Sequence, residues 1–360
     1  MVMNKRWLAG ILGIVLLVVI VFNIIPTSIA RENVSYYKAQ VINVNTEDNS
    51  RTIYLLGGPD KGKEVSANIG AKISSLDMTP PDYHTGSVVF VSHNLTETGT
   101  DNYSIIDYYR LSAGAWMFLF VIALAVIFAG WRGFGALAGL IFSIIVIGKF
   151  LIPGVANGNS PYLIAGVSIM IISLPGIYIA HGINRKTSVA LISTYITLLV
   201  AIGFSITATS LLKLSGVANE DAWLLSQLKP EINMHGVLLC GLLISLVGIL
   251  DDVTVGQASV IQELSIANSK LNTKELYKRG LRVGREHIAS LINTLVLVYV
   301  GASLLFIMYL TVVVPYPTIM VLNSELMMEE IVRSLVGSAS LILAVPITSV
   351  LAAKYLRKRR

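Results

Sequence analysis

Two adjacent carboxylates near the middle of the chain are the residues best suited to chemistry. Asp251 and Asp252 stand in the stretch GILDDVTVGQASVIQEL, residues 248–264, and follow an apolar run from Gly236 to Leu250. Ionised carboxylates close to lipid are costly unless they are paired or hydrated. The pair therefore indicates either the capped end of a helix or a polar site.

The first interpretation is structural. An apolar helix would stop near Leu250 and a second helix would begin at Thr254. Asp252 or Thr254 would then be the N-cap, and Thr254 with Gln257 would have the spacing of a capping box. A negative charge is favourable at a helix N-terminus. This arrangement uses only one of the two carboxylates.

The second interpretation is a proton or cation site that faces a water-filled cavity. On a helix, Asp252, Gly256, Ser259 and Glu263 would share one face at steps of four and three residues. The candidate ion- or solute-binding residues are Asp251, Asp252, Gln257, Ser259 and Glu263. The sequence leaves both interpretations open.

Three further titratable residues, His181, Glu286 and His287, are expected near the same membrane boundary. Histidine and carboxylate together could bind a divalent metal, so the three are candidate ligands. Boundary residues are more often simply solvated. Cys240 is the only cysteine, which excludes a disulfide framework, and no cofactor is expected.

Composition indicates the environment of these residues. The chain has 360 residues, of which 54% are hydrophobic and 13% are charged. Soluble proteins carry about twice this charged fraction. Runs of about 20 apolar residues, long enough to cross a bilayer, recur along the chain. We therefore expect a multi-pass membrane protein, mainly α-helical. Its net charge of +6 is spread over the ends of apolar segments, so nucleic acid is not an expected partner.

The apolar runs predict eight spans. Their approximate bounds are 7–25, 114–130, 133–152, 161–181, 187–212, 235–252, 288–314 and 333–353. The first run resembles a signal peptide, but it is long for one, and we interpret it as a retained helix within residues 1–30. Residues 111–360 would form a seven-helix membrane domain.

Lys and Arg predict the orientation in the cell membrane. With both termini in the cytoplasm, the inner segments include the basic tail KYLRKRR and all six basic residues between 257 and 287. The short outer segments contain only Lys149, Lys213, Lys229 and Arg333. This asymmetry satisfies the positive-inside rule.

Residues 31–110 would then be extracytoplasmic. Patches such as YKAQVINV and SVVFVS alternate with a period of two, and turn signals such as GGPDKG separate them. This pattern predicts a small β-rich domain, an antiparallel barrel or a sandwich. In contrast, residues 257–287 are polar with helical spacing, which predicts a cytoplasmic amphipathic or partly re-entrant helix.

GILDDVTVGQASVIQEL resembles the signature of the YibE/F-like family of bacterial multi-pass membrane proteins. The resemblance extends over nearly the whole chain and includes an outer β-rich domain that ends in IIDYYR. It implies a permease-like protein of unknown solute, in a family whose members often occur beside a second, shorter relative. It supplies no catalytic residues.

Two functions remain. One is a transporter of an unknown solute, coupled to H⁺ or a cation through the acidic pair. The other is a non-transporting scaffold or accessory subunit that works in the lipid bilayer with a partner membrane protein or a second copy of itself. An enzyme is not expected, because the chain has no Gly-x-Ser-x-Gly, His-Glu-x-x-His or P-loop motif.

Overall fold

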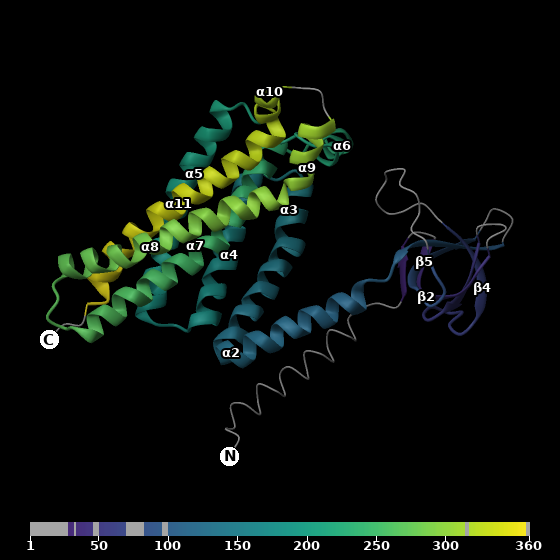
Figure 1. Cartoon of the computed structure of the whole chain (residues 1–360), viewed down its shortest axis with the longest axis horizontal. Helices are drawn as coiled ribbons and strands as arrows, with labels where there is room; N and C mark the ends of the chain where they lie inside the picture. Colours follow the sequence, from purple (N-terminus) through teal and green to yellow (C-terminus); the bar gives the residue numbers. More distant parts are fainter. Residues whose placement is uncertain are drawn as a thin grey trace, which may run out of the picture. The chain divides into compact units, whose positions relative to one another are not determined.

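The structure is a computed structural model that describes residues 28–31, 34–45, 50–69, 83–95, 100–313 and 317–357 (Figure 1). The predicted first span, residues 7–25, lies outside the described residues. The chain divides into two compact units, residues 1–131 and 132–360. Each is described by itself.

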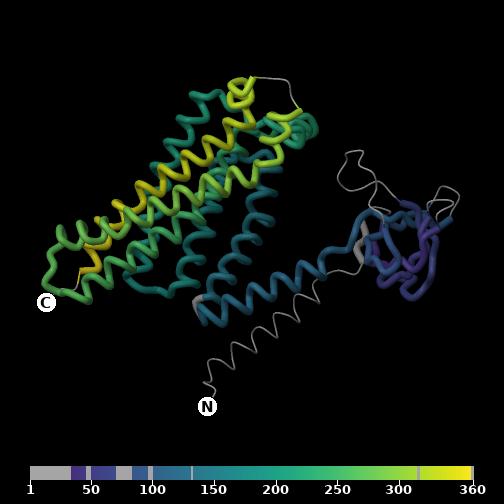
Figure 2. Tube along the Cα trace, viewed as in Figure 1, coloured from purple at the N-terminus to yellow at the C-terminus, as the bar shows by residue number. Residues whose placement is uncertain are grey.

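The first unit contains a small β-barrel, as expected for residues 31–110. Its described strands are β1 (Ser28–Arg31), β2 (Val34–Val44), β3 (Arg51–Leu55), β4 (Glu64–Ile69), β5 (Val88–Leu95) and β6 (Asp101–Tyr108). They pair in the order β1-β2-β3-β4-β6-β5, and a further pairing of β2 with β5 closes the barrel. Figure 2 shows the strands curling round one another. The β4–β6 pair is parallel, so the barrel is not purely antiparallel.

The crossover from β4 to β5, with β6 returning between them, is a Greek-key connection. Strands β2, β3, β4, β6 and β5 thus form a closed five-stranded Greek-key barrel. OB-folds have this architecture, and the similarity is limited to topology. Alternate residues of the strands fill the interior, among them Ala39, Ile53, Val89 and Ile105. This alternation is the period of two that the sequence displays.

Polar contacts close one end of the barrel. The Lys63 ammonium donates to Asp60 at 2.6 Å, and the Tyr103 hydroxyl donates to the same carboxylate at 3.3 Å. The hydrogen bond from Lys63 holds the pKa of Asp60 below its ordinary value. Burial, with Asp60 and Asp101 nearby, raises the pKa of Tyr103 to about 12. His93 lies against the Tyr103 ring and contacts Asp101 at 2.7 Å.

Helix α2 (Leu111–Val146) follows the barrel and is interrupted at Gly130, where φ is 59° and ψ is −138°. L side chains rarely adopt a positive φ, so a glycine suits this position. The interruption separates an apolar helix Leu111–Gly130 from a second one, Gly133–Ala156. The second continues through a π-helical turn, η1 (Ile147–Leu151), into α3 (Ile152–Ala156).

The rest of the second unit is helical. Its elements are α4 (Pro161–His181), α5 (Arg185–Leu211), α6 (Glu220–Leu228), α7 (Met234–Ala267), α8 (Thr273–Ala302), α9 (Leu304–Met308), η2 (Tyr309–Val313), α10 (Thr318–Leu322) and α11 (Glu325–Tyr355). In the described part of the chain, six helices are long and apolar enough to cross a membrane. The bent pair Thr273–Ala302 and Leu304–Val313, at 63°, makes seven if it counts as one span. Several spans are thus confirmed, and the total of eight stays a prediction.

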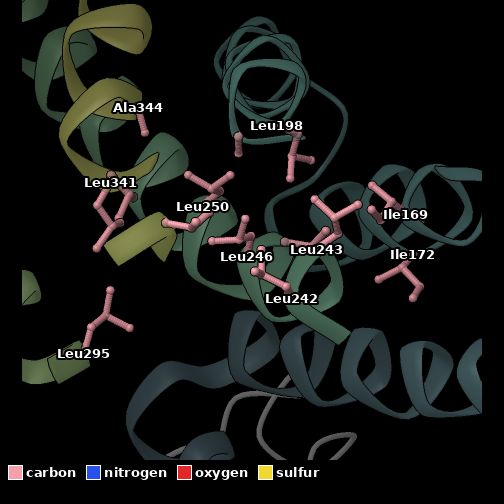
Figure 3. Close-up of a cluster of buried hydrophobic side chains, with 14 of the residues drawn as sticks. Ile169, Ile172, Leu198, Leu242, Leu243, Leu246, Leu250, Leu295, Leu341 and Ala344 are labelled. Atoms are coloured by element: carbon pink, nitrogen blue, oxygen red, sulfur yellow. The ribbon is translucent and has the colours of Figure 1, made fainter. Parts of the chain in front are cut away.

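Helices α5, α7 and α11 pack against one another at the centre of the second unit, with α8 on α7 and α11 and with α4 on α7. Figure 3 shows Leu242, Leu246 and Leu250 of α7 pointing into the shared core. Leu198 of α5 and Leu341 of α11 meet them there. Hydroxyls on α5 mostly bond along their own helix, as when Ser193 donates to the Val189 carbonyl at 2.7 Å.

Helix α7 corrects two expectations. It runs without a break for 34 residues, about 51 Å, and carries Asp251 and Asp252 in its interior, so neither residue caps a helix. Residues 257–287 are likewise not one amphipathic helix, because α7 ends at Ala267 and α8 begins at Thr273. The capping box at this junction joins Asn272 and Glu275.

Candidate solute-binding cavity

A cavity of about 510 Å³ lies within the second unit, between the helix Gly133–Ala156, α4 and α7. Aliphatic side chains and glycines make most of its wall. The polar side chains that line it are Ser143, His181, Asp251 and Asp252. The cavity follows α4 from Ile169 to its last residue, His181. We call the end of the bundle near His181 the cavity end.

Glycines determine where these helices touch and where they leave space. A Cβ on Gly135 would lie 2.6 Å from the Ile179 carbonyl oxygen, and one on Gly139 would lie 3.5 Å from the Gly176 Cα. The helix Gly133–Ala156 therefore approaches α4 closely, as small residues permit. In contrast, a Cβ on Gly248, which lines the cavity, would meet nothing within 4 Å.

Asp251 is half-buried, and its Oδ1 atom is buried without a hydrogen-bond partner among the described residues. Two threonine hydroxyls, those of Thr194 and Thr254, lie near Asp251. Thr254 donates to the Asp251 backbone carbonyl at 3.3 Å, and its hydroxyl contacts that of Thr194 at 2.9 Å. A buried acceptor without a donor costs about 1–3 kcal/mol, and more when it is charged. Asp252, the next residue, is exposed.

The structure thus brings together three of the predicted site residues, Asp251, Asp252 and His181, at one cavity. Glu286 and His287 are exposed on α8 and do not line it. Among the residues that the structure describes, no three His, Cys, Asp or Glu side chains are grouped so that they could hold a metal ion.

Gln257 lies outside the cavity and joins three helices. Its amide nitrogen donates to the Gly280 carbonyl of α8 at 2.9 Å and to the Ser349 hydroxyl of α11 at 2.8 Å. Side chains at Gly280 and Gly284 would clash with Ile261 and Val345. The glycines therefore let α8 approach the amide, and Gln257 has a structural place here.

Ser259 and Glu263 are also outside the cavity. The Ser259 hydroxyl donates to the Val255 carbonyl of its own helix at 2.7 Å, and Glu263 is exposed. The helical face predicted from Asp252 to Glu263 exists, but only Asp252 on that face reaches the cavity.

The opposite end of the bundle, which we call the Met234 end, holds polar residues that sequence reasoning missed. His235 bridges two helices there, since its ring nitrogens contact the Tyr162 hydroxyl of α4 and the Thr209 hydroxyl of α5, each at 3.1 Å. Glu325, the first residue of α11, accepts hydrogen bonds from the backbone amides of Ser215 and Gly216. These contacts fasten the N-termini of α4, α7 and α11 to the C-terminus of α5.

Two more residues lie towards this end. Cys240 is buried, and its thiol donates to the Pro161 carbonyl of α4 at 3.0 Å. Glu329, one turn beyond Glu325, is 8% exposed, and its Oε1 has no hydrogen-bond partner among the described residues. Glu325 and Glu329 are four residues apart, a helical spacing that could have indicated one polar face of α11.

A family model described as YibE/F-like protein matches residues 116–358, which include the whole cavity. No curated protein and no solved structure matches the chain. The match covers more than half of the chain, and the apolar helices agree with it. The chain belongs to the YibE/F-like family and is a membrane protein with several spans.

Proposed function

We propose that the protein is a permease of the cell membrane, with the cavity as its solute site and Asp251 as the group that recognises the charge of the solute. The observation that carries the proposal is the buried Oδ1 atom of Asp251, which has no donor among the described residues and belongs to a residue lining a cavity of about 510 Å³. Carboxylates inside membrane helices are rare, and those that face a cavity mark solute and ion pathways.

The depth of Asp251 supports this role. It follows Met234, the first residue of α7, by about 25 Å along the helix axis. The hydrocarbon core of a bilayer is about 30 Å thick. A solute bound at Asp251 would therefore lie near one boundary, with most of the bilayer between it and the other side.

The two ends of the bundle suit alternating access. Polar contacts of His235 and Glu325 fasten the helices at the Met234 end, and the cavity reaches His181 at the other. With both termini in the cytoplasm and the barrel outside, the cavity end faces the cytoplasm. Transport then requires the contacts at the Met234 end to open while the cavity end closes. Proton or cation coupling through the acidic pair would drive this exchange.

A second candidate is an accessory subunit that works with a shorter relative or with a second copy of this chain. The helix Gly133–Ala156 favours it, because only 22% of its most apolar window is buried, against 50% for α5, α7 and α11. Lipid or a partner helix would cover the remainder. We expect neither enzymatic activity nor nucleic-acid binding from either candidate.

The proposal is tested by electrical recording on proteoliposomes that hold the full chain. A panel of inorganic cations, amines, amino acids, carboxylates and sugars is applied to wild type and to Asp251→Asn, which preserves side-chain size. We expect at least one solute to give a current in wild type that falls at least tenfold in the variant. Equal responses of the two proteins to every solute would contradict a permease built on Asp251.

A further inference from the structure

We propose that the cavity selects a protonated alkylamine, an ammonium group that still carries N–H bonds on an apolar aliphatic body. This inference rests on the proposed function for its biological meaning, but its evidence is the chemistry of the cavity wall. Five features of that wall support it: its charge, its missing hydrogen bond, its lack of aromatic rings, its few oxygen ligands and its aliphatic side chains.

The charge of the wall favours a cation. Asp251 and Asp252 line the cavity, and none of the described residues that line it is Lys or Arg. His181 is the one other titratable side chain in the wall. An anion would therefore enter beside two carboxylates without a basic partner, at a cost that grows as water is excluded.

The missing hydrogen bond specifies the kind of cation. The Oδ1 atom of Asp251 has no donor among the described residues and no exposed surface, so a solute reaches it only when the carboxylate rotates towards the cavity. A primary or secondary ammonium supplies an N–H donor, and charge-assisted hydrogen bonds of this kind are about twice as strong as neutral ones. A quaternary ammonium has no N–H to offer and would leave the oxygen unsatisfied.

The rest of the wall excludes two other classes. Quaternary ammonium ions are commonly recognised by aromatic cages, and among the described lining residues there is no Phe, Tyr or Trp. Calcium takes about six to eight oxygen ligands. Here the oxygen-bearing lining side chains are Ser143, Asp251 and Asp252, and the Ser143 hydroxyl already donates to the Gly139 carbonyl at 2.9 Å.

An apolar body fits the remaining surface. Ile169, Ile172 and Ile177 of α4 and Ile244 and Val247 of α7 line the cavity beside the acidic pair. Burying one methylene contributes about 0.8 kcal/mol, which is about a fourfold change in affinity. Each carbon added to an alkylamine should therefore tighten binding until the cavity is full.

The experiment measures binding of defined amines to the purified full-length protein by calorimetry. The probes are n-butylammonium, n-hexylammonium, N,N,N-trimethylhexylammonium, K⁺ and Ca²⁺. We expect hexylammonium to bind about fifteenfold more tightly than butylammonium. The trimethyl compound should bind at least tenfold more weakly than hexylammonium, although its body is the same.

Two variants locate the binding. Asp251→Asn should weaken hexylammonium binding at least tenfold and abolish the preference over the trimethyl compound. Gly248→Phe should block binding by filling the cavity, since a side chain there meets open space. Its matched control is Gly241→Phe, two turns earlier on the same face of α7, exposed, with nothing within 4 Å of its Cβ and outside the cavity. The control should bind like wild type.

The outcomes separate this inference from the permease. The amine class would be overturned by tight binding of K⁺ or Ca²⁺ without amine binding. It would also be overturned by an affinity that does not change with the length of the alkyl chain. In either case, a current carried by another solute would still support a permease. Amine binding whose affinity increases with alkyl chain length, but without any current in proteoliposomes, would support the amine as ligand and contradict transport. Equal binding by Gly248→Phe and wild type would overturn the assignment to this cavity.

Discussion

The two ends of the helical bundle differ in how polar groups join the helices, although Glu329 near the Met234 end also has an Oε1 atom without a partner among the described residues. At the Met234 end, His235 and Glu325 are satisfied by contacts that join separate helices. At the cavity end, Asp251 has an oxygen without a donor in the described part of the chain, and Gly248 faces open space. Contacts that join separate helices specify one packing, whereas an unsatisfied carboxylate beside a cavity costs stability and suits a ligand. The contrast indicates that polar contacts stabilise the packing of helices at the Met234 end, whereas the cavity end provides a binding site.

The largest expected effect is on stability, when a glycine is replaced by alanine at each end of the bundle. Gly216→Ala places a Cβ against the backbone carbonyl of Met234 at a residue with φ of +79°, so it should destabilise the protein by about 2–4 kcal/mol. Gly248→Ala meets no neighbour and gains helix propensity, so it should stabilise by up to about 1 kcal/mol. Thermal unfolding of both variants checks the opposite signs. Equal melting temperatures would remove the distinction between the ends.

The second prediction concerns opening of the Met234 end. Glu325→Ala removes the acceptor of two backbone amides, and hydrogen bonds to a charged group contribute about 1.5–3 kcal/mol each. Opening there should expose Cys240, the only cysteine of the chain, and raise its rate of alkylation at least tenfold. Glu330→Gln is the matched control, because Glu330 contacts Arg333 on its own helix at 3.6 Å. Unchanged labelling in Glu325→Ala would show that this contact does not hold the end closed.

A third prediction separates structure from binding within the same predicted motif. Gln257→Leu leaves the Gly280 carbonyl and the Ser349 hydroxyl without their donor and should cost about 1–3 kcal/mol of stability. Binding to folded protein should be unchanged, because Gln257 is not in the cavity wall. Calorimetric unfolding together with hexylammonium titration checks both parts. A loss of affinity for hexylammonium without a loss of stability would show that Gln257 belongs to the binding site.

The smallest effect belongs to the barrel, where Asp60→Asn removes an exposed ion pair with Lys63. The pKa of Asp60 is lowered in the folded protein, so its contribution to stability is present at neutral pH and is lost as the pH falls below about 4. Protease resistance of the barrel in the full chain should therefore be slightly lower in the variant at pH 7 and equal to wild type at pH 3. A difference that persists at pH 3 would point to a cause other than the charge.

Much of the fold follows from sequence periodicity. The alternation in SVVFVS predicts a strand because one face of β5 is buried. Long apolar runs predict membrane spans because the lipid interior favours helices whose side chains are apolar. In the local sequence, the acidic pair is also compatible with a helix end, because it directly follows an apolar run. The continuity of α7 through Asp251 depends on packing against α5 and α11, which no window of sequence displays.

The cavity shows the same limit. His181 and Asp251 are 70 positions apart in the sequence and line the same cavity only because α4 packs beside α7. The spacing of Gly135, Gly139 and Ser143 could have indicated a close helix contact in advance, since small residues four apart are typical of such interfaces. The Asn272–Glu275 capping box could also have been found from residue types and spacing.

The most direct test of the solute site measures charge selectivity inside the cavity. Gly248→Cys in a Cys240→Ala background leaves one thiol, which is treated with a cationic and an anionic methanethiosulfonate reagent, and Gly241→Cys in the same background provides the reference. We predict that the ratio of cationic to anionic rates is at least tenfold higher at position 248 than at 241, and that Asp251→Asn abolishes this excess. Equal ratios at the two positions, or an excess that survives Asp251→Asn, would contradict a solute site organised by Asp251.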